Sequence, residues 1–481
     1  MKKVKYLTLA LAATTIAGSC STDRFLDEKP PLTTMLDQAI TNESQLKIGV
    51  NGLYNNLQST STYGGAIPTL SELLADHAFV SINNSNRFAL TRQPSLSFYT
   101  KFNGDISGIW SGLYGTILNA NNVLQNKGMI SDDPDISGTP AEYFAQAHAV
   151  RAMCYFDLIT LFAQYPGGAG ANPELGVPLH LDVAFGLGKK RATVSEVYAQ
   201  ILSDLDAANA SIASSTERKK LTKAGINMLY SRYYLATRDY QKADMYAQMV
   251  LDDTNSTLLP LNTTGIANFW APAGETNAEV IFGLDFNSLD LPGANDALIA
   301  TWYSGGTYKQ NFATKAFYDT FGAADVRRGR WYTTVGATGV NLANYPDNPK
   351  PVDVTKYKTI DRDVVVMRKT EAVFNQLEAL YHINPALALT KLNTWVTTFR
   401  DPGYSFTQTG QSLLEEILLQ KNKELFLEGF RYRDLKRNGI GFTNPQTGVT
   451  LSPSNYQFNA FPIPQSEMNT NTEIVQNPGY N

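Results

Sequence analysis

Cysteine and histidine are scarce in this chain, and the few that are present exclude several kinds of chemistry. The 481 residues include two cysteines and four histidines. None of the histidines lies in an HExxH or similar metal-ligand spacing. The chain also lacks a G-x-S-x-G nucleophile elbow, a P-loop and a Rossmann glycine pattern. The sequence therefore predicts no metal site, no cofactor and no catalytic residue, and it favours a protein that is not an enzyme.

Positive charge is not concentrated anywhere in the chain, and long hydrophobic runs are missing beyond its start. The formal net charge is −4, and without a basic patch we expect no nucleic-acid partner. No later apolar run approaches the length that a membrane-spanning helix needs. We therefore expect a soluble body.

The first twenty residues have the pattern of an export signal. A basic start at residues 1–5 is followed by an apolar stretch, 6–18, and small residues occupy 17–19 immediately before Cys20. The apolar stretch is too short to span a bilayer. We interpret 1–19 as a lipoprotein signal peptide and Cys20 as the lipidated residue; the alternative is a plain signal peptide with a chance cysteine. The remaining Cys154 is then a buried structural thiol.

Helical periodicity dominates the chain after a polar tether at 20–34. Apolar residues recur at helical spacing, with capping signals such as Thr193 and Glu196 opening the helix that follows them. Two segments, 222–252 and 371–399, each predict a pair of antiparallel helices, the plan of a tetratricopeptide-type (TPR-like) hairpin. The predicted helical regions are about 35–60, 111–127, 139–164, 193–252 and 369–436.

Two long segments break this periodicity. Residues 83–101 and 255–357 are rich in Gly, Pro, Asn and aromatic residues. Within the second segment a short strand-like run, 280–284, stands alone. Loops of this length in a compact domain are usually functional, so we expect the binding region there.

Several motifs, in this order, resemble the SusD/RagB family of nutrient-binding outer-membrane lipoproteins of Bacteroidetes. Cys20 is followed by Phe25-Leu26-Asp27, and Trp110 begins a W-x2-L-Y-x2-I-x2-A-N run. The most specific run is 420–435, with Lys423-Glu424-Leu425 and E-G-x-R-Y-x-D-L. The end of the chain, with F-P-I-P at 461–464 and Q-N-P-G-Y at 476–480, matches as well. The resemblance covers nearly the whole chain after the leader.

The resemblance implies a fold, a function and a partner. The fold would be mainly α, with TPR-like helical hairpins forming a superhelical scaffold, a loop-rich binding region and minor β structure, in one domain over 35–481. The protein would be lipid-anchored in the outer membrane, facing the exterior. It would bind oligomeric nutrients, above all oligosaccharides, and deliver them to a TonB-dependent transporter of the SusC type. The repeat helices would supply the docking surface.

The resemblance also places the ligand surface in loops at about 76–104 and 255–357. Aromatic rings there would take the apolar face of a ligand, and polar side chains its edges. Trp302 lies in a glycine-rich loop and could face either solvent or the core. The predicted ligand-binding residues are Asp76, Asn84, Arg87, Phe98, Tyr99, Asn103, Trp270, Trp302, Tyr303 and Tyr308.

Other charged and aromatic motif residues are interpreted as structural. Glu424, Glu428, Arg431 and Asp434 could be a carboxylate pair with an arginine, but we favour a buried ion network that holds the last helices to the body. The same interpretation applies to Arg151 with Asp157, and Trp110 and Trp395 are assigned to the core.

Three alternative functions remain open at this stage. The ligand could be a peptide, as in a RagB-like protein, or the chain could be a scaffold or adhesion lipoprotein with no small ligand. A surface glycosidase would need two carboxylates across a sugar, and acidic residues are too numerous for the sequence to single out a pair.

Overall fold

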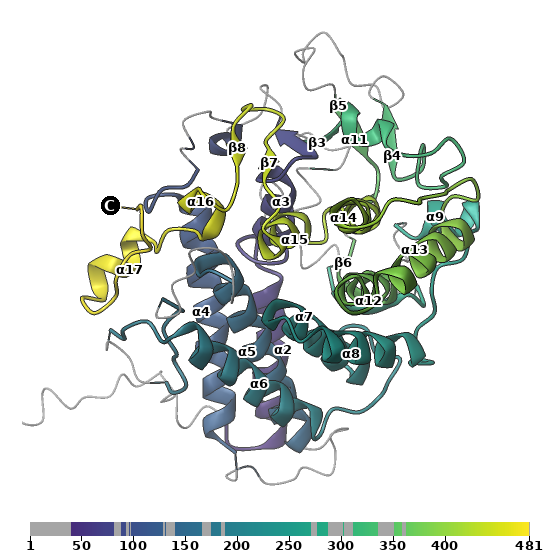
Figure 1. Ribbon diagram of the computed structural model, residues 1–481. Helices are drawn as coiled ribbons and strands as arrows, with labels where there is room; N and C mark the ends of the chain where they lie inside the picture. The colour runs from purple at the N-terminus through teal and green to yellow at the C-terminus, as the bar shows by residue number, and fades with distance from the viewer. Residues whose placement is uncertain are drawn as a thin grey trace, which may run out of the picture.

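The computed structural model describes residues 40–80, 88–92, 96, 98–127, 130, 140–165, 175–183, 188–270, 277–286, 302, 311–334, 351–357 and 362–480. The predicted mainly α fold is confirmed: helices make up most of the described structure. The strands β3 (Asn311–Thr314), β4 (Tyr332–Thr334) and β5 (Pro351–Val354) lie at one edge, whereas β6 (Val364–Arg368) lies among the helices (Figure 1).

Helices, all of them long except α3, form the first half of the scaffold. In Figure 1, α2, α4, α5 and α6 stand side by side, and α7 and α8 continue the row. The helices from α2 to α7 pack mainly against their neighbours in the row, and α8 also packs against a later helix, Lys369–Ile383. Their bounds are α2 (Glu43–Leu57), α3 (Ala66–Leu73), α4 (Gly104–Gln125), α5 (Pro140–Phe162), α6 (Val194–Asn209), α7 (Lys223–Thr237) and α8 (Tyr240–Asp252).

The α7–α8 pair is the hairpin that the sequence predicts at 222–252. α7 ends at Arg238, whose positive φ of 65° reverses the chain, and Asp239 caps α8 by accepting a hydrogen bond from the Lys242 amide. Ala243 and Ala247 face α7 with no exposed surface. Small residues at these positions let the two helices approach closely.

The second hairpin and the two helices that carry the 420–435 motif complete the scaffold. α12 (Lys369–Ile383) packs against both α8 and α13, so it joins the two hairpins. Asn384 caps α13 with its side chain, and Pro385 occupies the first helical position, a place where its missing N–H costs nothing. The remaining bounds are α13 (Pro385–Phe399), α14 (Gln411–Leu425) and α15 (Arg431–Asn438).

The strand content was underpredicted. The strand at 280–284 is confirmed as β2 (Val280–Leu284), but it does not stand alone, because it pairs antiparallel with β6 (Val364–Arg368). A four-stranded antiparallel sheet in the order β1-β3-β5-β4 also forms within the region expected to be loops. Its strands are β1 (Ala78–Val80), β3 (Asn311–Thr314), β4 (Tyr332–Thr334) and β5 (Pro351–Val354).

Short elements fill the space between these layers. They are η2 (Ala89–Arg92), α9 (Thr263–Asn268), α11 (Lys315–Asp319), β7 (Phe442–Thr443), β8 (Thr450–Leu451), α16 (Tyr456–Asn459) and α17 (Gln465–Thr470). The C-terminal segment returns to the N-terminal part of the scaffold, where α16 and α17 lie beside α4 (Figure 1). The Gln465 amide donates to the Lys101 carbonyl there. None of the described helices is both long and apolar enough to cross a membrane.

Candidate ligand-binding loop and a buried ion network

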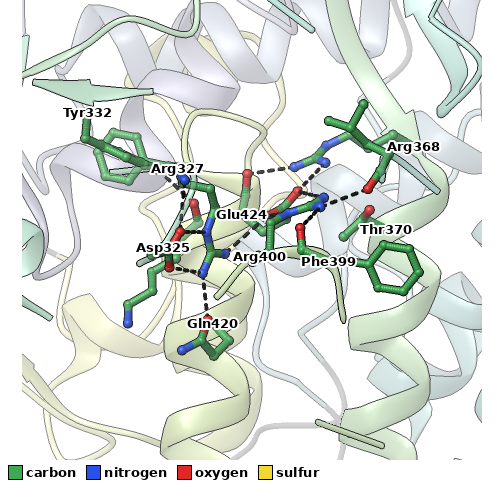
Figure 2. A network of polar contacts seen from close by, with 12 residues as sticks. Asp325, Arg327, Tyr332, Arg368, Thr370, Phe399, Arg400, Gln420 and Glu424 are labelled. Carbon is green, nitrogen blue, oxygen red and sulfur yellow. Dashed lines mark hydrogen bonds and ion pairs between the residues drawn. The ribbon is translucent and has the colours of Figure 1, made fainter. Parts of the chain in front are cut away.

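Glu424, from the most specific motif of the sequence, lies at the centre of a buried ion network (Figure 2). Its carboxylate accepts from Arg400 at 2.7 and 2.8 Å, from Arg368 at 2.7 Å and from Arg327 at 3.2 Å. These arginines come from β6, the end of α13 and the segment after α11. One carboxylate therefore joins three separate parts of the chain.

The network balances its own charge. Of the residues that the structure describes, four cationic and four anionic side chains take part, each no more than 2 % exposed. The members are Arg327, Lys356, Arg368, Arg400, Glu279, Asp325, Glu424 and Glu428. Burial alone would raise the pKa of Glu424, but Arg400 and Arg368 hold it well below the ordinary value. The buried charges are thus compensated, as burial of ions requires.

Tryptophan rings enclose the cationic members. The Lys356 ammonium lies 4.9 Å from the ring centre of Trp270 and 5.1 Å from that of Trp331, and Arg400 lies 5.0 Å from Trp395. Cation–π contacts of this kind are strongest where water is excluded. Trp270, predicted to bind ligand, is fully buried and packs against the network instead.

The interpretation of the motif charges as a structural ion network is confirmed, although the partners differ from those that proximity in sequence suggests. Glu428 pairs with Arg368 and Lys356. The four motif residues do not share one helix, because the chain breaks between α14 and α15 with Leu427 at a positive φ of 66°. Asp434 pairs with Lys421 and with Arg437.

Arg151 and Asp157 on α5 are also buried, but they do not pair with each other. Arg151 donates to Asp204 on α6 at 2.6 and 2.9 Å, and Asp157 accepts from Arg433 on α15 at 2.6 Å. The prediction of core positions for Trp110 and Trp395 is confirmed, and Cys154 is a buried free thiol.

The predicted ligand residue Asp76 is engaged by Arg431, which donates to both of its carboxylate oxygens at 2.8 and 2.5 Å. Burial would raise the pKa of Asp76, but the Arg431 guanidinium holds it well below the ordinary value. In this arrangement Asp76 ties the end of α3 to α15.

The other described residues of the predicted set have packing partners. Trp302, which could have faced either way, is 0 % exposed and packs edge-on against Phe426 with ring centres 5.6 Å apart. Phe98 and Tyr99 are buried against Phe461. In this arrangement these rings have no open face on which a ligand could stack. Their contact with a ligand stays a prediction.

Asn103 has a clear local role. Its side-chain oxygen accepts from the Asp105 amide at 2.7 Å and the Ile106 amide at 3.2 Å, and its side-chain nitrogen donates to the Phe98 carbonyl at 2.8 Å. It therefore caps α4 and fixes the preceding loop at the same time. Cys20, Asn84, Arg87, Tyr303 and Tyr308 lie outside the described residues.

The structure reveals an aromatic residue that the sequence analysis missed. Phe102, between the buried Tyr99 and the cap Asn103, is 74 % exposed. Its neighbour Lys101 places its ammonium 5.6 Å from the ring centre. A hydrophobic residue just before a helix cap often packs on an apolar residue at the fourth helical position, but in α4 that position is Ser107. The missing partner is the local signal that could have identified Phe102.

Within the described ranges, no group of three or more His, Cys, Asp or Glu side chains is placed to hold a metal ion. The loop 98–103 presents the exposed ring of Phe102 on a backbone that is held at both ends. This geometry suits stacking on a ligand rather than bond-breaking chemistry.

Comparison with known proteins agrees with the fold and the motifs. A family model described as starch-binding and associating with the outer membrane matches residues 24–235, and a model of the SusD family matches residues 299–480. The chain is 24 % identical to SusD-like protein P2 of Formosa agariphila, over 100 % of both chains. It is 30 % identical to the starch-binding protein SusD of Bacteroides thetaiotaomicron, over 31 % of this chain and 26 % of that protein.

Solved structures show the same fold. A SusD superfamily protein from Bacteroides vulgatus superposes with a TM-score of 0.80 at 23 % identity, covering 92 % of this chain and 100 % of the other. A SusD-like carbohydrate binding protein from the same species gives 0.73 at 21 % identity, covering 91 % and 98 %. With the two family models matching most of its length, the chain belongs to the SusD family.

Proposed function

We propose that this chain is an outer-membrane lipoprotein that binds oligosaccharides through the loop 98–103 and passes them to a SusC-like TonB-dependent transporter. The location of the binding site is supported by the exposed ring of Phe102 on a backbone that is held in place. Asn103 fixes the loop from one side, and the Lys101 carbonyl accepts from α17 on the other. A ring held in place in advance loses little entropy when a sugar stacks on it.

The class of ligand is supported by the family. One family model is described as starch-binding, and the relative from Bacteroides thetaiotaomicron is named a starch-binding protein. An aromatic face with the Lys101 cation beside it also suits the flat apolar face and hydroxyl edges of a sugar. The protein would act without changing its ligand chemically.

The membrane anchor and the transporter are parts of the same proposal. Cys20 would carry the lipid, and several acyl chains together would hold the body firmly at the outer membrane. The TPR-like helices would dock on the transporter, as stacked helical hairpins commonly do with partners. Labelling with a radioactive fatty acid should mark the wild-type chain and leave Cys20→Ser unmarked.

Calorimetric titration of the full-length protein, purified in detergent, tests the binding proposal. The ligands would be maltohexaose, other neutral hexasaccharides and a peptide of similar length. Phe102→Ala should weaken sugar binding about 3- to 10-fold, the value of one stacking contact, and Phe102→Trp should preserve it. Ile48→Ala, which removes another exposed apolar side chain, is the matched control.

Each alternative has its own outcome in this experiment. Binding of the peptide but of no sugar would favour a RagB-like role, and binding of neither would favour a scaffold. Shortened sugars after prolonged incubation would show a hydrolase. Equal affinity of Phe102→Ala and the wild type would remove Phe102 from the site.

A further inference from the structure

We propose that a second, separate site for a short neutral oligosaccharide lies in the groove between the end of α2 and the middle of α4. This proposal takes its ligand class from the proposed function but not its site. The groove has a volume of about 530 Å³, within the range of small-molecule sites. Its lining residues are Asn55, Asn56, Gln58, Ser59, Ser111, Gly112, Gly115, Thr116, Leu118, Asn119 and Phe286.

The sequence of α4 creates the groove by omitting side chains. At Gly112 a Cβ would lie 2.9 Å from the Thr62 methyl carbon, so glycine lets the turn after α2 approach the helix. One helical turn further, Gly115 has no atom within 4 Å of the place where a Cβ would stand. The first glycine brings the two walls together, and the second leaves the space between them open.

The walls are held in place without a ligand. The Gln58 side chain donates to the Asp285 carbonyl and accepts from Asn55 at 3.1 Å. The Thr62 hydroxyl donates to the Leu57 carbonyl at 2.8 Å and so fixes the turn. The Phe286 amide donates to Asp363 at 2.9 Å, which anchors the aromatic residue of the lining. Binding would therefore need little rearrangement.

The chemistry of the lining selects uncharged, hydroxyl-rich ligands. Among the described residues that line the groove, four carry carboxamides and three carry hydroxyls, and none is ionisable. Carboxamides both donate and accept hydrogen bonds, as sugar hydroxyls do. The side-chain amides of Asn56 and Asn119 have no hydrogen-bond partner among the described residues. Both amides can therefore bind a ligand. A carboxylate, phosphate or ammonium would lose water here and gain no counter-charge.

A peptide fits this groove less well than a sugar. Extended peptides are usually held by a free strand edge or by apolar pockets for alternate side chains. Here both long walls are helices, and the apolar lining is limited to Leu118 and Phe286. Phe286 is buried, so the partly exposed Leu118 offers the small apolar surface for the C–H face of one sugar ring.

The groove is distinct from the Phe102 loop. At 1.5 Å per helical residue, Gly115 lies about 18 Å along α4 from the cap Asn103. A trisaccharide in the groove would therefore leave the Phe102 ring free, and variants at the two places can be compared independently.

Calorimetry and ligand-observed NMR on the full-length protein in detergent test the second site. The probes are maltotriose, cellotriose, mannotriose and xylotriose, with trigalacturonate and trialanine as charged and peptide counterparts. Gly115→Met should fill the groove and lower the affinity for the bound neutral trisaccharide at least 10-fold. Asn119→Ala should lower it about 3-fold.

Matched controls separate groove filling from a general effect. Gly52→Met on α2 also places a side chain where no atom lies within 4 Å, but Gly52 is not part of the lining. Its affinity should stay within 2-fold of the wild type, and so should that of Phe102→Ala for the trisaccharide in the groove. Melting temperatures of all variants confirm folding.

The outcomes distinguish this site from the one at Phe102. Loss of sugar binding in Phe102→Ala with none in Gly115→Met would overturn the groove and leave the proposed function intact. Loss of trisaccharide binding in Gly115→Met alone would support the groove, and the hexasaccharide titration of Phe102→Ala would then decide separately whether Phe102 is the platform. Binding of trigalacturonate or trialanine in place of neutral sugars, or of no probe at all, would overturn the assignment of ligand class.

Discussion

Two buried helices of this protein, α5 and α14, are stabilised in opposite ways. α5 is buried along most of its length by apolar residues such as Ala147, Cys154 and Leu158. α14 buries a run that includes Lys421, Lys423 and Glu424 in its last turns. The first helix is held mainly by packing against α4 and α6, with buried ion pairs only at Arg151 and Asp157 among its described residues. The second is held at its end by the ion network that reaches β6 and the end of α13.

The difference predicts how each region responds to change. Apolar packing is graded, because a substitution costs free energy in proportion to the volume it removes. A buried charge network is not graded, because removing one member leaves its partners charged and unpaired. The network fixes the relative positions of distant segments, whereas the helical row tolerates replacements of similar size.

The largest effect is expected at Glu424. Glu424→Gln removes the charge that Arg327, Arg368 and Arg400 share, and it should lower the free energy of unfolding by about 3–5 kcal/mol. Urea denaturation followed by circular dichroism measures this. Leu158→Met, a replacement of similar volume in α5, is the control and should cost less than about 1.5 kcal/mol. A cost below about 1 kcal/mol for Glu424→Gln would show that the network is not essential.

A graded series in α5 tests the other half of the comparison. Leu158 is fully buried, so Leu158→Ala should cost about 2–4 kcal/mol, and Leu158→Met only a fraction of that. The same denaturation experiment gives both values. If the two substitutions were equally costly, packing in α5 would be as intolerant of change as the charge network.

Glu72 on α3 is a buried glutamate without the arginines that surround Glu424. One oxygen accepts from the Leu427 amide at 3.2 Å, and the other has no hydrogen-bond partner within the described part of the chain. Burial raises the pKa of Glu72 to about 8, although Arg431 opposes the shift. The folded protein therefore holds this proton over a pH range in which the unfolded chain has released it.

The raised pKa makes the contribution of Glu72 depend on pH. It is fully present below the ordinary pKa of 4.5 and is lost as the pH rises to about 8. Glu72→Gln should match the wild type at pH 4 and be more stable by about 1–3 kcal/mol at pH 8. Unfolding curves at four pH values between 4 and 8 measure the trend. An unchanged difference across this range would mean that Glu72 does not titrate there.

The sequence predicts the helical row well because its signals are local. The hairpin at 222–252, the cap at Thr193 and the core position of Trp110 all follow from residues within a few turns of each other. The charges of the motif around Glu424 could likewise be assigned to the interior. Their partners could not, because Arg368 and Glu279 are 56 and 89 positions from the groups they bind.

The binding surface was harder to predict for the same reason. Whether an aromatic residue in a loop is buried depends on segments far away in the chain. Trp302 is covered by Phe426, and the Trp302 indole lies near Thr69, whereas nothing comparable covers Phe102. The groove beside α4 depends on the fit of Gly112 to a turn about fifty residues earlier, which no local pattern reports.

The smallest expected effect tests whether polar groups in the helical row act locally. Thr193 caps α6 by accepting from the Glu196 amide at 3.1 Å, and Thr193→Ala should cost about 1 kcal/mol, while Thr193→Ser should cost little. Because this cap serves only its own helix, its effect should add to that of Leu158→Ala within about 0.5 kcal/mol in a double-mutant cycle. Glu424→Gln with Arg368→Met should not be additive, since those two side chains share the same charge balance. Strong coupling between Thr193 and Leu158 would mean that the helical row is as interdependent as the ion network, and the contrast between α5 and α14 would then lie in composition alone.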